Sequence, residues 1–185
     1  MPVTKARDHS ADLGKFLEDY SYQDELTAAL DCRKEDFSQR DINEIVLWKL
    51  NRYVAIPQDV LNSLNAAKEW EPSEHRKAAS LLETLIDTHG CDLPMASTFL
   101  RYRNPNVFQI IDRHAYRAVY GTKYPLYTAS AVSRKVDVYF KYLDAVRSLC
   151  DEKGIEFRHA DRILYMFDKK NNGTLNEQKS KTVTA

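Results

Sequence analysis

The chain has little cysteine, no excess of either charge and no long run of hydrophobic residues. Its three cysteines, Cys32, Cys91 and Cys150, are far apart and odd in number, so neither a disulfide framework nor a metal-binding knuckle is readable. A reducing compartment fits best. The first residues lack the apolar core of a secretory signal, and no segment has the length needed to cross a bilayer. We therefore expect a soluble intracellular protein, cytoplasmic or nucleoid-associated, with no membrane partner, metal or cofactor.

The sequence also lacks stretches in which polar and apolar residues alternate as they do in strands. Apolar residues recur instead at helical spacing almost throughout. Two such stripes are Ile42, Ile45, Val46, Leu50 and Tyr53, and Ala78, Leu81, Leu82, Leu85 and Ile86. Boundary signals agree with helices, because a capping-box-like entry, prolines near helix starts and glycines after helix ends occur at Ser38 and Asp41, Pro57 and Pro72, and Gly90, Gly121 and Gly154.

With 185 residues and 43% hydrophobic content, the chain is long enough to bury a core. We predict a single all-α globular domain of about eight helices over residues 1–170 and a flexible polar tail over 171–185. The longest helix is predicted from about Ala129 to Glu152, and another near His159 to Asp168. Their inward-facing residues are predicted to be Val132, Val136, Tyr139, Phe140, Leu143, Val146 and Cys150, and Ile163, Leu164 and Phe167.

The charge is balanced over the whole chain but not along it. With 27 basic and 27 acidic residues, the net charge is zero, so no global field attracts nucleic acid or an anionic membrane. Residues 101–147, however, contain nine basic and three acidic residues, a local charge of +6 against −6 for the remainder. Such a segment suits a surface that follows phosphates, and it equally suits a solvated helix face without a partner.

Two aspartates stand at predicted helix starts. Asp92 is a good N-cap for a helix over Leu93 to Arg103, and Gly90 lets the chain bend before it. The free amides of a helix start can hold a phosphate, although the Asp92 carboxylate competes for them. Asp112 follows Ile110 and Ile111 and would cap a helix over residues 113–120, where the dipole favours its ionised form. For both residues the simple alternative is an ordinary cap.

The segments that contain the two aspartates resemble two sequence motifs of a known protein family. Residues 88–96 (Thr-His-Gly-Cys-Asp-Leu-Pro-Met-Ala) and 111–117 (Ile-Asp-Arg-His-Ala-Tyr-Arg) resemble the hairpin, L-P-G-V-G-x-K-T-A, and the catalytic segment, V-D-T-H-x-x-R, of helix-hairpin-helix DNA glycosylases of the endonuclease III superfamily. Asp112, His114 and Arg117 match the catalytic pattern at the family spacing. The resemblance covers about residues 85–120 and implies a glycosylase-like helical fold, with Asp112 as the catalytic carboxylate and DNA as the partner.

Two residues differ from the family pattern, and the differences restrict which reactions the resemblance implies. Asp92 stands where the family has its second hairpin glycine, and Pro94 stands where the bifunctional enzymes have a lysine. Pro94 cannot form a Schiff base, so the resemblance implies monofunctional base excision without lyase chemistry. Lys49 is a candidate to supply the missing amine. The C-terminal cysteines that hold the iron–sulfur cluster of endonuclease III are absent, so the chain would be a divergent member without that cluster.

Cleaving the bond between base and sugar builds positive charge on the sugar, which a carboxylate beside it stabilises. The base must first leave the duplex and enter a pocket. The candidate residues are Asp112 for catalysis, then Gly90, Cys91, Asp92, Arg101, Arg113 and Arg117 for nucleic-acid binding, and Trp48, Lys49, His114 and Tyr116 for the pocket. Trp48 can equally be a half-buried packing residue, and His114 a structural brace of the turn.

The sequence therefore favours a DNA glycosylase-like protein, an N-glycosidic hydrolase that removes a damaged or modified base. The alternative is a non-catalytic module that uses the same helical scaffold to bind nucleic acid or a protein partner. A third interpretation is an unrelated all-helical protein in which the motif is coincidental, and an Asp112 buried away from any cleft would favour it.

Overall fold

The computed structural model describes residues 17, 22–34, 36–51, 54–173 and 175 of the chain. Its regular elements in these ranges are all helices, eight of them α-helices, with no strand, which confirms the all-α prediction. Where the sequence predicts one domain over residues 1–170, the chain divides into two compact units, residues 1–53 and 54–185. In the described ranges no helix combines the length and apolar character needed to span a bilayer.

The N-terminal unit contains α1 (Asp24–Asp31) and α2 (Gln39–Lys49). Ser38 starts α2 with the predicted capping box, in which the Ser38 side chain accepts a hydrogen bond from the Asp41 amide and the Asp41 side chain accepts one from the Ser38 amide. The predicted inward stripe of α2 is wrong at three positions, because Ile42, Val46 and Leu50 are 43%, 49% and 62% exposed, while Ile45 is partly buried. Tyr53, the last residue of that stripe, lies outside the described residues.

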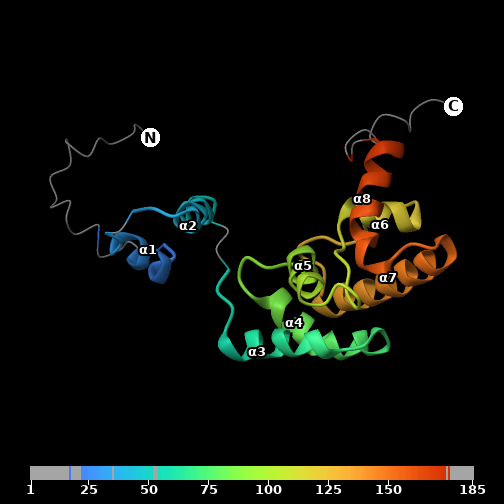
Figure 1. Ribbon diagram of the computed structural model, residues 1–185, viewed down its shortest axis with the longest axis horizontal. Coiled ribbons are helices and arrows are strands. Elements are labelled where there is room, and N and C mark those ends of the chain that lie inside the picture. Colours follow the sequence, from blue (N-terminus) through green and yellow to red (C-terminus); the bar gives the residue numbers. More distant parts are fainter. Residues whose placement is uncertain (1–16, 18–21, 35, 52–53, 174, 176–185) are drawn as a thin grey trace. The chain divides into compact units, whose positions relative to one another are not determined.

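The C-terminal unit carries the large hydrophobic core. The stripe from Ala78 to Ile86 is buried as predicted, and so is the predicted stripe of the longest helix, with Val132 only partly buried at its start. Figure 1 shows α6 and α8 side by side at one end of this unit, where they make the most extensive helix pair. The helices in chain order are α3 (Gln58–Ala66), η3 (Ala67–Glu69), η4 (Pro72–Ala78), α4 (Ala79–Asp87), α5 (Leu93–Arg103), α6 (Arg113–Tyr120), α7 (Val132–Lys153), η5 (Phe157–His159) and α8 (Ala160–Asn171).

The helix boundaries in this unit follow local signals. Helices α5 and α6 start after their capping aspartates as predicted, and Gly154 ends α7 with a φ of 65°. Helix α7 begins later than predicted because a turn precedes it, in which the Tyr127 amide donates to Ser130 Oγ (2.9 Å) and the Ser130 amide donates to the Tyr127 carbonyl (2.9 Å).

Helix α8 buries fewer apolar residues than predicted. Leu164 is buried, but Ile163 and Phe167 are 42% and 51% exposed, so their predicted inward orientation is wrong. The inner face of α8 is polar instead, since Asp161 and Asp168 are buried there in ion pairs with arginines. At these two positions of α8, ion pairs with buried arginines, and not hydrophobic contacts, account for the side chains that face the core.

The segment between α5 and α6 is not helical, yet most of it is buried, including Val107, Phe108, Gln109 and Ile111. Its carbonyl groups would be costly to bury without partners, and two tyrosines of α7 supply them. Tyr139 Oη donates to the Gln109 carbonyl (3.0 Å), and Tyr142 Oη donates to the Ile110 carbonyl (2.9 Å). Burial raises the pKa of both hydroxyls, so both tyrosines stay protonated donors. These bonds fix the backbone that leads into Asp112.

Replacing Tyr142 with Phe removes one of these donors and leaves a buried carbonyl without a partner. We expect the Y142F variant to lose about 1–3 kcal/mol of unfolding free energy in urea titration. The matched control is Y102F, which removes a hydroxyl from a ring that is 68% exposed and should leave stability unchanged. Equal stability of Y142F and wild type would contradict a role for this bond.

Candidate functional site

Asp112 is the N-cap of α6 and is partly exposed. Its Oδ1 accepts a hydrogen bond from the Ala115 amide (2.7 Å), which ties the carboxylate to the positive end of the helix. The preceding residue, Ile111, is fully buried, and its amide donates to Ser97 Oγ of α5 (3.3 Å). The carboxylate therefore stands at the boundary between a rigid core and the surface.

Two cavities meet at Asp112. We call them the α8 cavity and the hairpin cavity, and their volumes are about 380 Å³ and 170 Å³. Asp112 lines both, and the two sets of lining residues have no other member in common. The α8 cavity is lined by Ile110, Asp112, Asp161, Arg162, Tyr165 and Met166, and the hairpin cavity by Asp92, Pro94, Asp112, Arg113, Tyr124, Leu126, Tyr127, Thr128 and Lys135.

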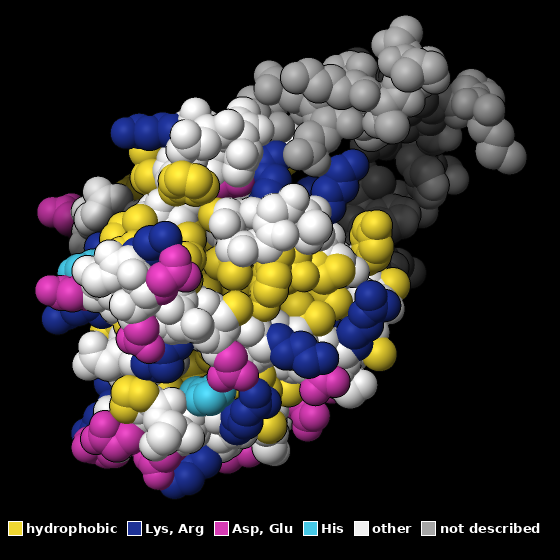
Figure 2. All heavy atoms as spheres, turned by 90° about the vertical axis from the view of Figure 1, so that its right-hand side faces the viewer, with side chains coloured by type: hydrophobic (Ala, Val, Ile, Leu, Met, Phe, Trp, Pro, Cys, Tyr) yellow, Lys and Arg dark blue, Asp and Glu magenta, His cyan; other side chains and the backbone are white. Residues whose placement is uncertain are grey.

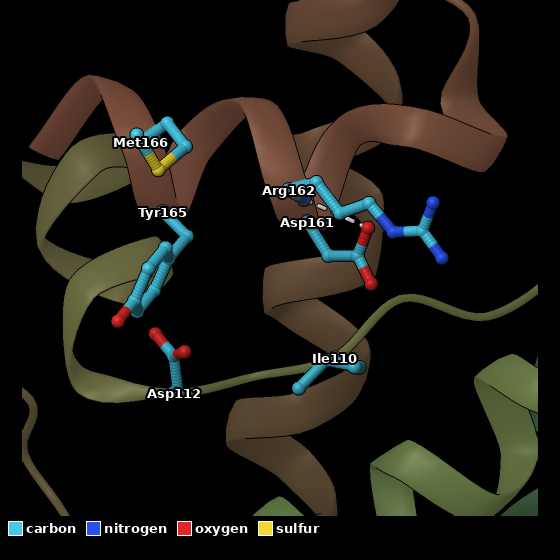
Figure 3. A pocket seen from close by; sticks show the side chains of 6 residues that line it. All are labelled: Ile110, Asp112, Asp161, Arg162, Tyr165 and Met166. Atoms are coloured by element: carbon cyan, nitrogen blue, oxygen red, sulfur yellow. Dashed lines mark hydrogen bonds between the residues drawn. The ribbon is translucent and has the colours of Figure 1, made fainter.

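The α8 cavity has chiefly apolar walls. Figure 3 shows the Tyr165 ring and the Asp112 carboxylate pointing toward one another, with Met166 above the ring and the Arg162 side chain extending away from both. Asp161 is almost fully buried, and its oxygens are engaged by the Arg162 amide (2.8 Å) and by Arg101 Nε (3.1 Å). The Asp112 carboxylate and the Tyr165 hydroxyl face the space, and the hydroxyl accepts a long hydrogen bond from Lys169 Nζ (3.5 Å).

The hairpin cavity is the more charged of the two. Lys135 of α7 is buried there, and its Nζ donates to Asp92 Oδ1 (2.7 Å) and to the Thr128 carbonyl (2.9 Å). Tyr124 lies in the same wall, and burial raises the pKa of its hydroxyl well above its ordinary value. Arg113 is exposed at the start of α6 and completes the lining. The cavity therefore brings Asp112, from one helix start, together with Asp92, from another.

The amides of the first turn of α5 are already bonded. The Leu93 amide donates to Asp92 Oδ1 (2.7 Å), Pro94 has no amide hydrogen, and the Met95 amide donates to the Asp92 carbonyl (2.9 Å). Two residues of this turn that were predicted to contact nucleic acid are also engaged inside the protein. Asp92 accepts a hydrogen bond from Lys135, and the Cys91 side chain is buried. Burial, followed by the nearby Asp92 charge, raises the pKa of Cys91 to about 11, so its thiol stays neutral. At Gly90, a φ of 78° explains the glycine at this bend.

Two of the three arginines predicted to contact phosphates point into the protein. Arg117 is 4% exposed and donates to both oxygens of Asp168 (2.8 and 2.7 Å) and to the Gly173 carbonyl (3.0 Å). Arg101 is 6% exposed and pairs with Asp161 while donating to the Arg158 carbonyl (3.0 Å). Arg113 alone of the three is exposed beside Asp112.

These pairs also change the local charge. Three basic residues of the segment 101–147 pair with acidic residues outside it, and one acidic residue of the segment, Asp144, pairs with Arg76 outside it, so the local excess falls from +6 to +4. The three basic residues pair as Arg101 with Asp161, Arg117 with Asp168, and Lys135 with Asp92. The surface near Asp112 is therefore less basic than the sequence count implies.

The residues predicted for a pocket lie in different places. His114 Nδ1 lies 2.6 Å from Asp168 Oδ2, and its ring meets Tyr165 edge-on at 5.0 Å, so it supports the wall of the α8 cavity. Tyr116 packs against Tyr120 and Tyr124. Trp48 and Lys49 belong to the N-terminal unit, where Trp48 is half-buried and its Nε1 donates to Thr27 Oγ1 (2.9 Å), while Lys49 is exposed.

Tyr165, Met166 and Lys135 line the cavities but were not among the residues predicted from the sequence. The first two are on α8, more than 50 residues after Asp112. The sequence did contain one signal for the orientation of α8. Asp161 and Asp168 are seven positions apart and so share one helix face, and if that face is buried, both need basic partners. Across the described ranges, no three His, Cys, Asp or Glu side chains gather as metal ligands would.

The Asp168 cluster makes stability depend on acid. Burial alone would raise the pKa of Asp168, but hydrogen bonds from Arg117, Asn172 and His114 outweigh it and lower the pKa from 3.8 to about 2. Because the folded pKa is the lower one, the stabilisation is complete above the unfolded value and is lost as the pH falls from about 4 toward 2. Its size is about 2 kcal/mol.

We expect D168N to be destabilised at neutral pH by about 3 kcal/mol, because it leaves the Arg117 guanidinium buried without a counter-charge. The difference in unfolding free energy between wild type and D168N should shrink by about 2 kcal/mol between pH 5 and pH 2. Denaturant titrations at several pH values measure it. The exposed-site variant D137N is the control, and a difference that does not change with pH would contradict the assignment.

Comparison with protein-family models, with curated protein sequences and with solved structures finds no match in any of the three. The resemblance to the helix-hairpin-helix glycosylases stays a prediction, and the function proposed below rests on these residues and their geometry.

Proposed function

We propose that this protein is a monofunctional DNA glycosylase that releases an altered base, with Asp112 as its carboxylate. One observation carries the proposal: Asp112 lines both the α8 cavity and the hairpin cavity. A nucleotide extruded from DNA has two dissimilar parts, a flat ring and a charged sugar–phosphate. With the ring in the apolar α8 cavity and the sugar–phosphate toward the charged hairpin cavity, the bond between them lies at Asp112.

The carboxylate suits that bond chemically. As the base departs, positive charge develops on the sugar, and a fixed negative charge beside it lowers the barrier without having to reorganise. The bond from the Ala115 amide fixes Oδ1, and the described residues give Oδ2 no hydrogen bond, so this oxygen can face the sugar or orient a water. Because the electrostatic effect requires a fixed geometry, the rigid segment before Asp112 is part of the site.

The hairpin cavity fits hydrolysis without lyase chemistry. Of the described residues, Lys135 is the one lysine that lines either cavity, and its Nζ donates to Asp92 and to the Thr128 carbonyl. Pro94, also in the lining, has no amine. Arg113 is exposed beside Asp112 and can contact a phosphate, and Tyr127, which is 78% exposed, offers a ring to a neighbouring base.

The test is base release from duplexes that each carry one altered base, read by alkaline cleavage at the abasic site. Wild type should release at least one base of the panel, and D112N should be slower by about 100-fold or more. Asn caps a helix as well as Asp, so D112N should keep its fold. The matched control is D137N, which changes an exposed aspartate of α7 and should retain full activity.

A second candidate function is a non-catalytic binding module. It is favoured by the hydrophobic side chains that gather on the face shown in Figure 2 and by the exposure of Ile163, Met166 and Phe167 on α8. Wild type that binds duplex DNA but releases no base from a broad panel would favour this function over the enzyme. Wild type that neither binds nor releases would favour a protein partner.

A further inference from the structure

The α8 cavity has one aromatic wall, and the structure holds that wall in place. The Tyr165 ring meets the His114 ring edge-on, with centroids 5.0 Å apart and an angle of 75° between the planes. His114 is itself held by Asp168 (2.6 Å), which Arg117 anchors from inside α6. The ring therefore has a fixed orientation before any ligand arrives, which lowers the entropic cost of stacking a ligand on it.

The rest of the cavity offers little hydrogen bonding to a ligand ring. Asp161 uses its oxygens on Arg162 and Arg101, and the Arg162 side chain points away from Tyr165 (Figure 3). Ile110 and Met166 add apolar surface, and a thioether adapts its shape to a flat ring. Contacts in the cavity are thus dominated by area rather than by donors and acceptors.

One charged group also approaches the ring. Lys169 Nζ lies 5.1 Å from the Tyr165 ring centroid and donates to the Tyr165 hydroxyl at 3.5 Å. Its side chain is exposed and can swing into solvent, so an incoming ring can take its place. Tyr165 is only partly exposed, and its hydroxyl lies on the Asp112 side of the cavity (Figure 3).

We propose that the α8 cavity receives a purine ring stacked on Tyr165, and that the site selects its base by stacking area rather than by hydrogen bonding. The inference rests on the proposed function and names its substrate class: altered purines in preference to altered pyrimidines. A volume of about 380 Å³ accommodates the two-ring base, and the larger ring gains more from the one aromatic wall. His114 is a positioning residue, since it acts through Tyr165.

The test separates binding from chemistry. A duplex with a single unpaired 2-aminopurine, a fluorescent purine, is titrated with wild type, Y165F and Y165L. Stacking on Tyr165 quenches the extruded ring, so the Y165L complex should be several-fold brighter than the wild-type complex and bind about 10-fold more weakly. Y165F keeps the aromatic ring and should therefore retain most of the stacking affinity that Y165L loses. The control is Y102L, which removes an exposed ring outside both cavities.

Base release gives the second readout. Wild type should show a kcat/KM at least about 10-fold higher for purine than for pyrimidine lesions, and Y165L should lose this preference mainly through KM. Thermal unfolding of Y165L, followed by circular dichroism, confirms that the variant is folded; if it is not, Y165M replaces it.

The outcomes for the two proposals are distinct. Base release that depends on Asp112, with fluorescence and purine preference unaffected in Y165L, overturns the stacking inference and leaves the glycosylase in place. Tyr165-dependent quenching without base release supports the purine site and overturns the enzyme. A preference for pyrimidine lesions, or the absence of any bound complex, overturns the inference.

Discussion

The site depends on two hydrogen bonds, from Tyr139 and Tyr142 of α7 to the carbonyls of Gln109 and Ile110. Without them, the segment before α6 would bury polar backbone groups at a cost of about 1–3 kcal/mol each and would instead move toward solvent. Because the bonds hold it inside, Ile111 is buried and Asp112 emerges at one defined point. A carboxylate can stabilise a developing charge only if it is already in place, so this buried polar contact is the condition for the proposed chemistry.

The second constraint is the polar inner face of α8. Asp161 and Asp168 draw Arg101 and Arg117 inward, and burial of these pairs joins α8 to α5 and α6. Ion pairing of this kind contributes little net stability compared with hydrophobic packing, but it permits one geometry only, because each guanidinium must meet its carboxylate. The same pairs set the register in which Tyr165 faces Asp112, and they leave Ile163 and Phe167 exposed on the other side of the helix.

Local features of this fold could be predicted from the sequence, and distant partners could not. The starts of α5 and α6 and the capping box at Ser38 depend on residues within one turn, so residue type and spacing suffice to find them. The partners of Arg101 and Arg117 lie 60 and 51 residues further along the chain, beyond any periodic pattern. A count of charges along the segment therefore overstated its basic surface, and two arginines that were predicted to contact phosphates, Arg101 and Arg117, lie in the interior. Asp112 was found because its cap is local, while Tyr165 was missed because its place depends on how α8 packs.

In the hairpin cavity, the two aspartates differ in how their carboxylates are bonded. Lys135 donates a hydrogen bond to Asp92, which also caps α5. Both side chains are therefore used to join α7 to the start of α5. The Lys135 nitrogen already donates to Asp92 and to the Thr128 carbonyl, so these hydrogen bonds would have to break before it could attack a carbon. Asp112 differs from Asp92 in having an amide on one oxygen and open cavities on both sides, which makes it the group that can meet a reacting sugar.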